Sequence, residues 1–377
     1  MKIGIVCYPT FGGSGVVATE LGMALADNGH EVHFITYNQP VRLDFLSHKL
    51  HFHQVLIEEY PLFQYQPYEL ALSSKMVEVV EKHELEVLHV HYAIPHAYAA
   101  FMAKQMLLEK GISIKVVTTL HGTDITLVGS HPTYKTAVEF SINNSDVVTA
   151  VSNNLKQTTN HLFKIKKEIQ VVYNFIDIEK YDKAENQECK RDALAKPNER
   201  ILTHISNFRP VKRVEDVIKI FYEVQKEIPS KLLMIGEGPD RAKAEILTKK
   251  LGITDNVFYL GNSTETVKIL CYTDLFLLPS QTESFGLAAL EAMAAKTAVI
   301  STNTGGLPEV NIQGKTGFLS DLGDIKDMAK NAISILKEDA ILDQFKRNAK
   351  EHTKKFSLQN ILPVYEEIYN SCYKTKV

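Results

Sequence analysis

Three positively charged side chains fall within five residues of the run NFRPVKR: Arg209, Lys212 and Arg213. The run follows an apolar stretch typical of a strand and precedes a helical pattern, so the cations lie at a helix N-terminus, where the helix dipole disfavours positive charge. A bound diphosphate would explain their placement, because Arg is a forked donor and Lys a point charge. We expect a diphosphate site here, with a solvated helix start as the alternative.

Two carboxylates eight residues apart form a second candidate. Glu283 is expected in a loop after a strand, and Glu291 about one turn inside a helix that begins near Gly286. The backbone N–H groups of Phe285 to Leu287 would then be free to bond an anion or a hydroxyl. We expect one carboxylate to contact a sugar hydroxyl and the other a ribose diol.

A histidine and a glycine-rich loop also follow predicted strands. His121 comes directly after the apolar run 115–120 and precedes a glycine, a position that favours a cleft; a structural histidine is the alternative. Gly12 to Gly15 (GGSG) follow the first strand and open the first helix. The spacing is not GxGxxG, and Tyr37 and Asn38 stand where a dinucleotide site needs an acidic residue. We expect a loop that binds a phosphate or carboxylate, or else an ordinary flexible turn.

Other histidines and the cysteines point to no metal site. His89 and His91 would share one face of a strand, but His96 lies beyond Pro95, and no Cys or carboxylate completes a ligand set. The four cysteines are far apart and form no CxxC pair, so we expect reduced thiols, as in a cytosolic protein. They are Cys7, Cys189, Cys271 and Cys372.

Alternating strands and helices must position these residues. Strands are expected at residues 3–7, 31–37, 87–92, 115–120 and 146–151 in the first half, and at 201–206, 231–235, 257–260, 275–278 and 298–301 in the second. This order implies parallel strands and right-handed crossovers, hence two α/β domains with doubly wound parallel sheets. The polar run 182–200 is the expected boundary region. Ligands of such sheets bind at the carboxyl ends of strands, and two domains face to face would form a cleft.

Length and composition agree with this organisation. At roughly 150 residues per domain, a chain of 377 residues suggests two domains. The 42 basic and 45 acidic residues leave a net charge of −3, which argues against a protein that wraps nucleic acid. The sequence has no uncharged apolar run long enough to span a membrane, and its first apolar run is too short for a signal peptide. We therefore expect a cytoplasmic protein without a membrane anchor.

Six motifs occur along the chain in one order: GGSG, HGTD, NFRPVKR, GEGPD, ESFGLAALE and TGGLPEV. In these the chain resembles the retaining glycosyltransferases of the GT-B fold, in the large family that includes sucrose-phosphate, phosphatidylinositol mannosyl and mycothiol-pathway transferases. The resemblance implies two Rossmann-like domains that face each other across a cleft. Residues 1–170 would bind the acceptor, with a C-terminal helix at about 358–377 packed back on them, and residues 171–357 would bind a nucleotide sugar.

The resemblance also implies roles for single residues. Arg209 and Lys212 match the pair that holds the donor diphosphate and neutralises the leaving UDP. Glu291 matches the carboxylate on the ribose hydroxyls, Glu283 the one on the transferred sugar, and His121 the histidine beside the sugar C6 hydroxyl and the reacting centre. Further donor contacts are expected from Gly13, Gly15, Asn207, Gly236, Phe285, Gly286 and Leu287. Candidates for binding the acceptor are Ser14, Tyr92, Thr123 and Asn153.

Within the family, CYPTFGGSGVVATELG, HVHYAIPHA and LHGTDIT resemble the branch that transfers N-acetylglucosamine from UDP-N-acetylglucosamine to L-malate in bacillithiol biosynthesis. Fixed cations would stabilise the charge on the departing diphosphate. The malate hydroxyl would attack from the same face, and the departing phosphate oxygen would take its proton. We expect no metal or other cofactor, because no DxD stands in the expected loop and Asp177-Ile178-Glu179 is the nearest similar run.

Three alternatives stay open at this point. The acceptor could be an inositol phosphate, a sugar or a lipid, since malate follows from the branch resemblance alone. A UDP-N-acetylglucosamine 2-epimerase shares the two-domain fold and needs no acceptor. A two-domain sugar-binding protein would release no UDP. The sequence also leaves a homo-oligomer open, and it indicates no nucleic-acid partner.

Overall fold

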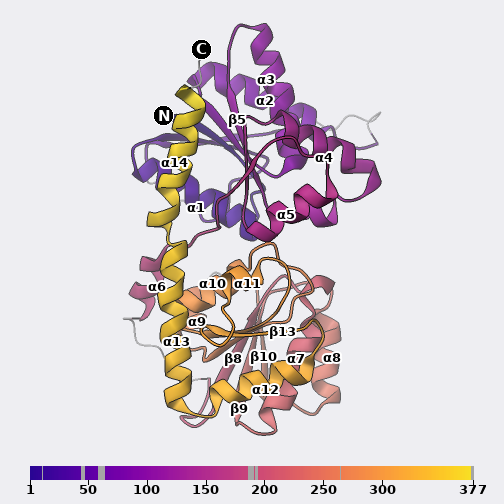
Figure 1. Cartoon of the computed structure of the whole chain (residues 1–377), viewed down its shortest axis with the longest axis vertical. Coiled ribbons are helices and arrows are strands. Elements are labelled where there is room, and N and C mark those ends of the chain that lie inside the picture. Colours follow the sequence, from indigo (N-terminus) through magenta and orange to yellow (C-terminus); the bar gives the residue numbers. More distant parts are fainter. Residues whose placement is uncertain are drawn as a thin grey trace. The chain divides into compact units, whose positions relative to one another are not determined.

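The chain folds into two units, seen in the computed structural model of Figure 1. Unit 1 comprises Met1–Asn174 with Gln359–Val377, and unit 2 comprises Phe175–Leu358. The divisions predicted from the sequence lie after residues 170 and 357. The structure describes residues 1–10, 12–43, 47–57, 64–185, 191, 194–263 and 265–374.

The expected boundary at 182–200 is wrong, because the chain passes from unit 1 to unit 2 after Asn174. The described part of this run includes the end of helix α6 (Ile178–Glu185) and the start of a strand at Arg200. Helix α6, whose end forms the start of this run, has three Lys or Glu residues among its first six, a pattern typical of an exposed helix and not of a linker.

Unit 1 contains a seven-stranded parallel sheet in the order β3-β2-β1-β4-β5-β6-β7. Its strands are β1 (Lys2–Val6), β2 (Glu31–Thr36), β3 (Leu50–Gln54), β4 (Val87–His91), β5 (Lys115–Leu120), β6 (Val147–Ala150) and β7 (Ile169–Val171). The central strands are covered on both faces, so they appear in the sequence as apolar runs. The edge strands β3 and β7 were not predicted, because LHFHQ alternates with polar residues and β7 has three residues only.

Helices cover both faces of this sheet. They are α1 (Gly13–Asp27), α2 (Tyr68–His83), α3 (Tyr98–Glu109), α4 (Pro132–Asn144), α5 (Asn153–Leu162) and α14 (Leu358–Lys374), with short helical turns η1 (Ala93–Ala97) and η2 (Thr123–Leu127). Apolar residues of α2 and α3 form one core with β1, β2 and β4. On the opposite face α1 lies so close to β2 that a Cβ at Gly22 would come within 2.3 Å of the Phe34 ring.

Helix α14, yellow in Figure 1, returns the chain to unit 1. The Tyr369 hydroxyl is buried and lies 2.7 Å from Nδ1 of His89 on β4. Nearer the surface, Glu366 accepts hydrogen bonds from the Asn28 amide at 2.6 Å and from the His30 ring at 2.9 Å. Unit 1 is therefore built from two segments that lie far apart in the sequence.

Unit 2 contains a six-stranded parallel sheet in the order β10-β9-β8-β11-β12-β13. The strands are β8 (Arg200–Ile205), β9 (Ser230–Ile235), β10 (Val257–Gly261), β11 (Leu275–Leu278), β12 (Ala298–Thr302) and β13 (Gly317–Ser320). The edge strand β13 was not predicted, because its four residues carry little apolar signal. Together the two sheets confirm the predicted pair of doubly wound α/β folds.

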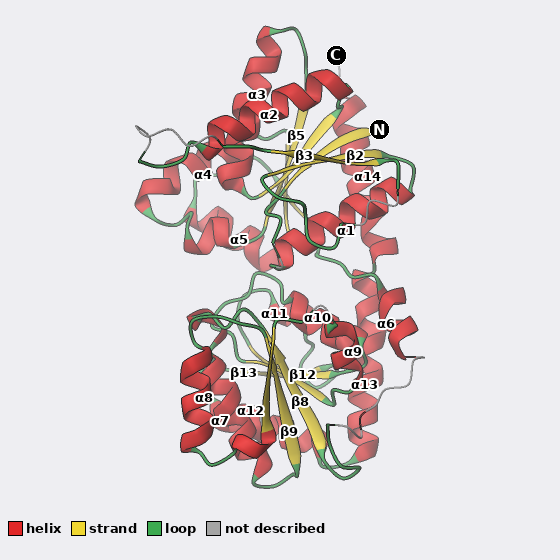
Figure 2. Cartoon of the chain, turned by 180° about the vertical axis from the view of Figure 1, so that it is seen from behind, coloured by secondary structure: helices red, strands yellow, loops and turns green. Residues whose placement is uncertain are grey.

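The helices of unit 2 lie on both sides of its sheet, as Figure 2 shows. One side carries α7 (Val214–Gln225), α8 (Arg241–Lys250) and α12 (Ile325–Leu336), and the other carries α9 (Thr266–Cys271), α10 (Leu287–Ala294) and α13 (Asp339–Thr353); α11 (Leu307–Val310) is a single turn. Helix α7 buries Val214, Val217, Ile218 and Phe221, the spacing of one helical face.

Strand order reverses at one point in each sheet. In unit 1 the neighbours β1 and β4 send their following helices to opposite faces, and in unit 2 β8 and β11 do so. The loops at the carboxyl ends of such strands diverge and leave a crevice, which is where open α/β sheets bind ligands. The predicted site residues follow these strands or the strands β5, β6 and β9, so the fold places them at the carboxyl edges of the sheets, where ligands are expected.

The cysteines differ in part from the expectation of reduced thiols. Cys7 and Cys372 are buried free thiols, as expected, but Cys271 forms a disulfide. Cys189 lies outside the described residues. Among the described helices, none has the length and apolar character needed to cross a bilayer.

Candidate functional site

The loop after β8 separates the three cations of the basic run. Arg209 is exposed, while Lys212 ends a short helical turn, η4 (Pro210–Lys212), and is half-buried. Arg213 instead forms an ion pair with Asp216 in the first turn of α7, with Nη2 and Oδ2 2.5 Å apart. The structure therefore leaves Arg209 and Lys212 as the candidates for binding an anion and accounts for Arg213 by a contact within the helix start.

Lys212 and Glu283 meet where the loops after β8 and β11 adjoin. The Lys212 ammonium lies 2.5 Å from Oε1 of Glu283, and the Ser280 hydroxyl donates to the same oxygen at 2.9 Å. The two side chains are only 21% and 14% exposed. The backbone N–H of Gln281 also donates to the Val211 carbonyl at 2.7 Å. These contacts hold a cation and a carboxylate together at the point where the strand order reverses.

Two glycines allow the loop after β12 to pack closely against the backbone of Glu283. The Gly306 N–H donates to the Glu283 carbonyl at 2.8 Å, and a Cβ at Gly305, whose φ is +58°, would lie 1.9 Å from the same oxygen. Any larger residue at position 305 would displace the backbone that carries the Glu283 side chain. The motif TGGLPEV contributed to the family resemblance, but the sequence alone indicated no role for these two glycines.

The start of α10 offers backbone donors beside this pair. The helix begins at Leu287 after Gly286, which has φ +100° and caps the helix with its backbone, not with a side chain. Phe285 is buried and makes an edge-to-face contact with Phe356 at a centroid distance of 5.5 Å, so its side chain anchors the loop. Glu291 lies half-buried one turn into the helix, as predicted.

Gly236 and Asn207 lie where the loops after β8 and β9 touch. Gly236 has φ +123°, and a Cβ there would come within 1.7 Å of the Ser206 carbonyl oxygen. Gly238 approaches the Asn207 carbonyl in the same way. The glycines of GEGPD are thus required by contact between two loops of the protein, whatever ligand binds beside them. The Asn207 side chain itself is exposed.

A buried histidine that sequence reasoning missed supports this loop. His204 on β8 bonds to the Leu277 carbonyl through Nδ1 and to the Ser206 hydroxyl through Nε2, both at 2.8 Å. Burial is the main reason that its pKa is lowered to about 4, so the ring is neutral at pH 7. Its only signal in the sequence is a histidine within an apolar strand.

In unit 1, His121 is buried directly after β5. Its Nε2 lies 2.8 Å from Nδ1 of His91 on β4, and the two rings stack with centroids 5.0 Å apart. Burial lowers the pKa of His121 to about 3, so the ring is neutral at physiological pH. It can therefore offer a hydrogen bond to a ligand but no positive charge.

Asp124 locks the loop that carries His121. Its carboxylate accepts hydrogen bonds from the backbone N–H groups of Ala93 at 2.8 Å, Gly122 at 2.9 Å and His121 at 3.3 Å. Burial raises the pKa of Asp124 to about 6. Through these hydrogen bonds Asp124 joins the loop after β5 to the loop after β4. Sequence reasoning quoted Asp124 only as part of HGTD, since its partners come from a second strand.

Ser14 and Tyr92 form a polar pair beside His121. The two hydroxyls lie 2.5 Å apart, and the Tyr92 ring lies 5.2 Å from the His121 ring. Tyr92 has φ +90°, a backbone conformation that a non-glycine residue rarely adopts and that occurs mostly at functional sites. Three of the predicted residues therefore come together in unit 1.

The first helix starts beside this group. Helix α1 begins at Gly13 with Gly12 as its N-cap, so no side chain caps its first N–H groups. Gly15 is required by packing, because a Cβ there would lie 2.5 Å from the carbonyl oxygens of Tyr8 and Thr10. The N-terminus of α1 retains the backbone donors that an anion needs.

The remaining acceptor candidates lie on separate loops. Thr123 is exposed at the start of η2, and Asn153 is exposed at the start of α5, where its amide donates to the Tyr173 hydroxyl at 2.8 Å. Both residues follow the carboxyl ends of neighbouring strands, β5 and β6.

The other histidines of HVHYAIPHA serve the interior. His89 uses both ring nitrogens within the protein, bonding to Tyr369 and to the Thr119 hydroxyl at 2.7 Å each. His96 bonds through Nδ1 to the His91 carbonyl at 2.5 Å. His91, which sequence reasoning weighed only as a metal ligand, positions His121.

The family of the chain follows from this fold and from two sequence matches. Residues 11–180 match the model of "Glycosyltransferase Family 4", and residues 185–352 match that of "Glycosyl transferases group 1". The chain belongs to the GT-B glycosyltransferases and is an enzyme of that class. A curated relative, the N-acetyl-alpha-D-glucosaminyl L-malate synthase of Bacillus anthracis, is 48% identical over 370 residues, which are 98% of this chain and 96% of the relative.

Solved structures agree on the fold. Sucrose-phosphate synthase from Thermosynechococcus elongatus superimposes with a TM-score of 0.80 at 20% identity and covers 100% of both chains. HepE of Anabaena, solved in complex with UDP, gives a TM-score of 0.78 at 18% identity over 98% of this chain and 99% of its own. At these identities the two neighbours establish the architecture alone.

Proposed function

We propose that this enzyme transfers N-acetylglucosamine from UDP-N-acetylglucosamine to the hydroxyl of L-malate. The transfer retains the α configuration and yields UDP and the α-glucosaminyl malate precursor of bacillithiol. The observation that carries the proposal is the 48% identity to a named malate synthase over nearly the full length of both chains. An identity that extends through both units includes the loops of the donor and the acceptor residues alike.

Unit 2 would bind the donor. Arg209 would grip the diphosphate as a forked donor, and Lys212 would contribute a point charge from beside Glu283. Glu283 would bind a hydroxyl of the transferred sugar, and Glu291 the ribose hydroxyls. The N-terminus of α10 at Phe285 to Leu287 and the loops at Asn207 and Gly236 would complete the donor site with backbone contacts.

Unit 1 would bind the acceptor. The hydroxyls of Ser14 and Tyr92 and the N-terminal amides of α1 are donors suited to the carboxylates of malate. Thr123 and Asn153 would add polar contacts from the neighbouring loops. His121, which is neutral, would donate a hydrogen bond to the sugar C6 hydroxyl, and Gly13 and Gly15 would let the backbone approach the donor phosphate.

The proposed reaction exchanges one bond to the anomeric carbon for another. The malate oxygen bonds to C1 of the sugar as the bond from C1 to the β-phosphate oxygen breaks, and that oxygen takes the malate proton. Negative charge grows on the diphosphate in the transition state, so fixed cations at Arg209 and Lys212 lower the barrier. In this proposal the transfer needs no metal ion.

The decisive experiment measures UDP release from UDP-N-acetylglucosamine with separate acceptors: L-malate, inositol 3-phosphate, glucose and none. We expect release with L-malate only, and an α-linked product by NMR. Release that prefers another acceptor would replace malate. Conversion of the donor to a second UDP-sugar without acceptor would identify an epimerase, and donor binding without release would identify a sugar-binding protein.

A further inference from the structure

A cluster of ionisable side chains lies in unit 1 apart from the residues discussed so far. Four histidines take part: His33 on β2, His51 and His53 on β3, and His83 at the end of α2, with Glu31 beside them. In the sheet register His33 pairs with His51, and Ile35 pairs with His53. Paired residues share a face, so all of these side chains lie on the face that α2 covers.

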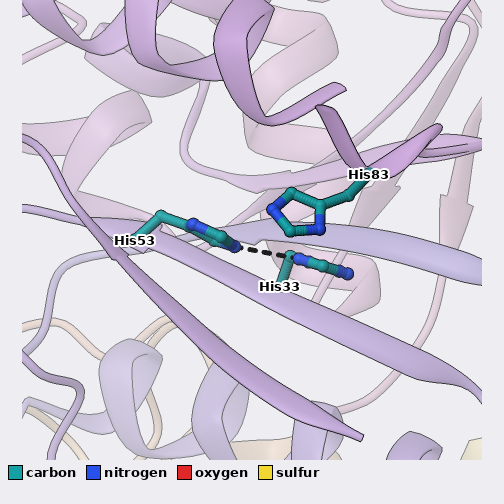
Figure 3. Close-up of side chains that lie close together, drawn as sticks. All are labelled: His33, His53 and His83. Atoms are coloured by element: carbon teal, nitrogen blue, oxygen red, sulfur yellow. Dashed lines mark hydrogen bonds between the residues drawn. The ribbon is translucent and has the colours of Figure 1, made fainter. Parts of the chain in front are cut away.

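Three of the imidazoles converge on one point. Nδ1 of His33 lies 2.9 Å from Nε2 of His53, the contact drawn in Figure 3. One nitrogen from each of His33, His53 and His83 lies within 4.8 Å of the others. A tetrahedral zinc ion with Zn–N bonds of about 2.0–2.1 Å holds its ligand nitrogens about 3.3–3.4 Å apart. The three nitrogens therefore lie near the spacing that one zinc ion requires.

Glu31 supplies the supporting contact that metal-bound histidines usually have. Its Oε1 lies 3.1 Å from Nε2 of His33 and 3.4 Å from Nε2 of His51. A carboxylate that accepts the proton of one ring nitrogen leaves the lone pair on the other nitrogen. For His33 that other nitrogen is Nδ1, the atom that faces His53.

Burial gives the cluster a closed side and an open side. His33 is fully buried, whereas His53 and His83 are half-buried, so solvent reaches the group from their side. Burial and the neighbouring imidazoles lower the pKa of His33 and of His53 to about 4, with Lys75 acting on His53 in the same direction and Glu78 against it. Both rings are thus neutral at pH 7, and neutral imidazole is the form that ligates metals.

We propose that His33, His53 and His83 bind one divalent transition-metal ion of the zinc class, with Glu31 orienting His33 and a water in the fourth position. Three imidazoles favour such ions over Mg²⁺ and Ca²⁺, which prefer oxygen ligands. The ion would join β2, the edge strand β3 and the end of α2. His83 lies four residues before β4 begins, whereas the transfer residues follow the carboxyl ends of strands, so the ion would lie apart from the transfer residues.

The test uses the untagged full-length protein, stripped of metal with a chelator and dialysed. Zinc is titrated by calorimetry and, separately, against a chromogenic chelator. We expect one ion per chain and a melting temperature that rises by several degrees with added zinc. Cobalt bound in place of zinc should give the visible absorption of a low-coordinate histidine site.

Substitutions identify the ligands. His53→Gln and His83→Gln should each weaken zinc binding by at least tenfold, and Glu31→Gln, a positioning change, by about 10- to 100-fold. Because His53 and His83 are half-buried, both variants should fold, which circular dichroism checks. His161→Gln, at an exposed histidine of α5, should bind like the wild type.

Two results would overturn the proposal. One is a wild type that binds no more zinc than the His53→Gln/His83→Gln double variant does. The other is a loss of binding in His51→Gln while His53→Gln and His83→Gln bind normally. Neither result bears on the acceptor panel, because this readout is metal binding and not transfer.

Discussion

At the scale of single residues, the contact between Lys212 and Glu283 fixes the position of the Lys212 ammonium. The Lys212 ammonium and the Glu283 carboxylate lie 2.5 Å apart and form an ion pair. A bound diphosphate would add negative charge beside Lys212, which would then interact with two anions. The pair thus keeps the ammonium fixed near the strand ends, so the charge needs no rearrangement when the sugar–phosphate bond breaks.

Replacing Lys212 or Arg209 should reduce turnover and leave the fold intact. We expect Lys212→Ala and Arg209→Ala to lower kcat by about 10²- to 10³-fold, the range for loss of one preorganised charge or donor. UDP release at saturating donor and malate measures the effect. Arg213→Ala is the matched control, because Arg213 pairs with Asp216, and it should keep turnover within about threefold. Equal losses in Lys212→Ala and Arg213→Ala would remove the diphosphate role.

His121 should matter as a neutral hydrogen-bonding group. We expect His121→Ala to lower kcat by about 10²-fold through loss of one donor to the sugar. His91→Leu should cause a smaller loss, because it frees the His121 ring from its 2.8 Å partner. His161→Ala controls for general effects of losing an imidazole in unit 1. Wild-type kcat in His121→Ala would contradict the assignment.

At the scale of elements, prediction from sequence succeeded where a strand is covered on both sides. Strand β5 was predicted with the bounds that the structure has, and β11 likewise, because continuous apolar runs mark buried parallel strands. The edge strands β3, β7 and β13 lack that signal. These strands are short and only partly buried, so the sequence alone did not predict them.

The candidate site divides in the same way. The sequence predicted that Arg209, Lys212, Glu283 and His121 follow strand ends, and the structure places them there, while their roles in the site stay predictions. The positioning roles of Asp124 and His91 could not be predicted, because their hydrogen-bond partners lie on or after other strands. The His33 cluster combines residues of three elements, β2, β3 and α2, and its only local signal is the His-x-His of β3, whose outer residues share a face.

Helix α14 offers a test of packing energetics in unit 1. Tyr369→Phe removes the hydroxyl that bonds to the buried Nδ1 of His89 and leaves that atom without this partner. We expect the free energy of unfolding to fall by about 1–3 kcal/mol, measured by urea denaturation. Tyr373→Phe on the same helix is the control, because Tyr373 is exposed, and it should change stability by less than about 0.5 kcal/mol. Equal effects of the two changes would argue against a stabilising Tyr369–His89 bond.

At the scale of the whole molecule, buried neutral histidines should make stability depend on pH. Burial lowers the pKa of His89 and of His121 to about 3 and that of His204 to about 4. The unfolded chain therefore binds more protons than the folded chain below pH 6.5, and stability falls as the pH drops from 6.5 toward 4. Asp124 acts in the opposite direction, because its pKa is raised to about 6, but it is one group against several.

The melting temperature should consequently be level from pH 8 to 7 and decline steadily from pH 6.5 to 4.5. Scanning fluorimetry across this range measures it. His204→Gln, which removes one such group from unit 2, should have a lower melting temperature at pH 7.5 and a shallower decline on acidification. A melting temperature that is constant down to pH 4.5 would show that these imidazoles do not control acid stability.

The division of unit 1 into two segments also has a consequence for synthesis on the ribosome. Phe175–Leu358 is continuous and leaves the exit tunnel in one piece, so unit 2 can complete its sheet while translation is still under way. Unit 1 starts to emerge first, but Tyr369 reaches it only after all of unit 2 has been made. The amino-terminal part of unit 1 therefore lacks its contacts with α14 until nearly two hundred further codons have been translated.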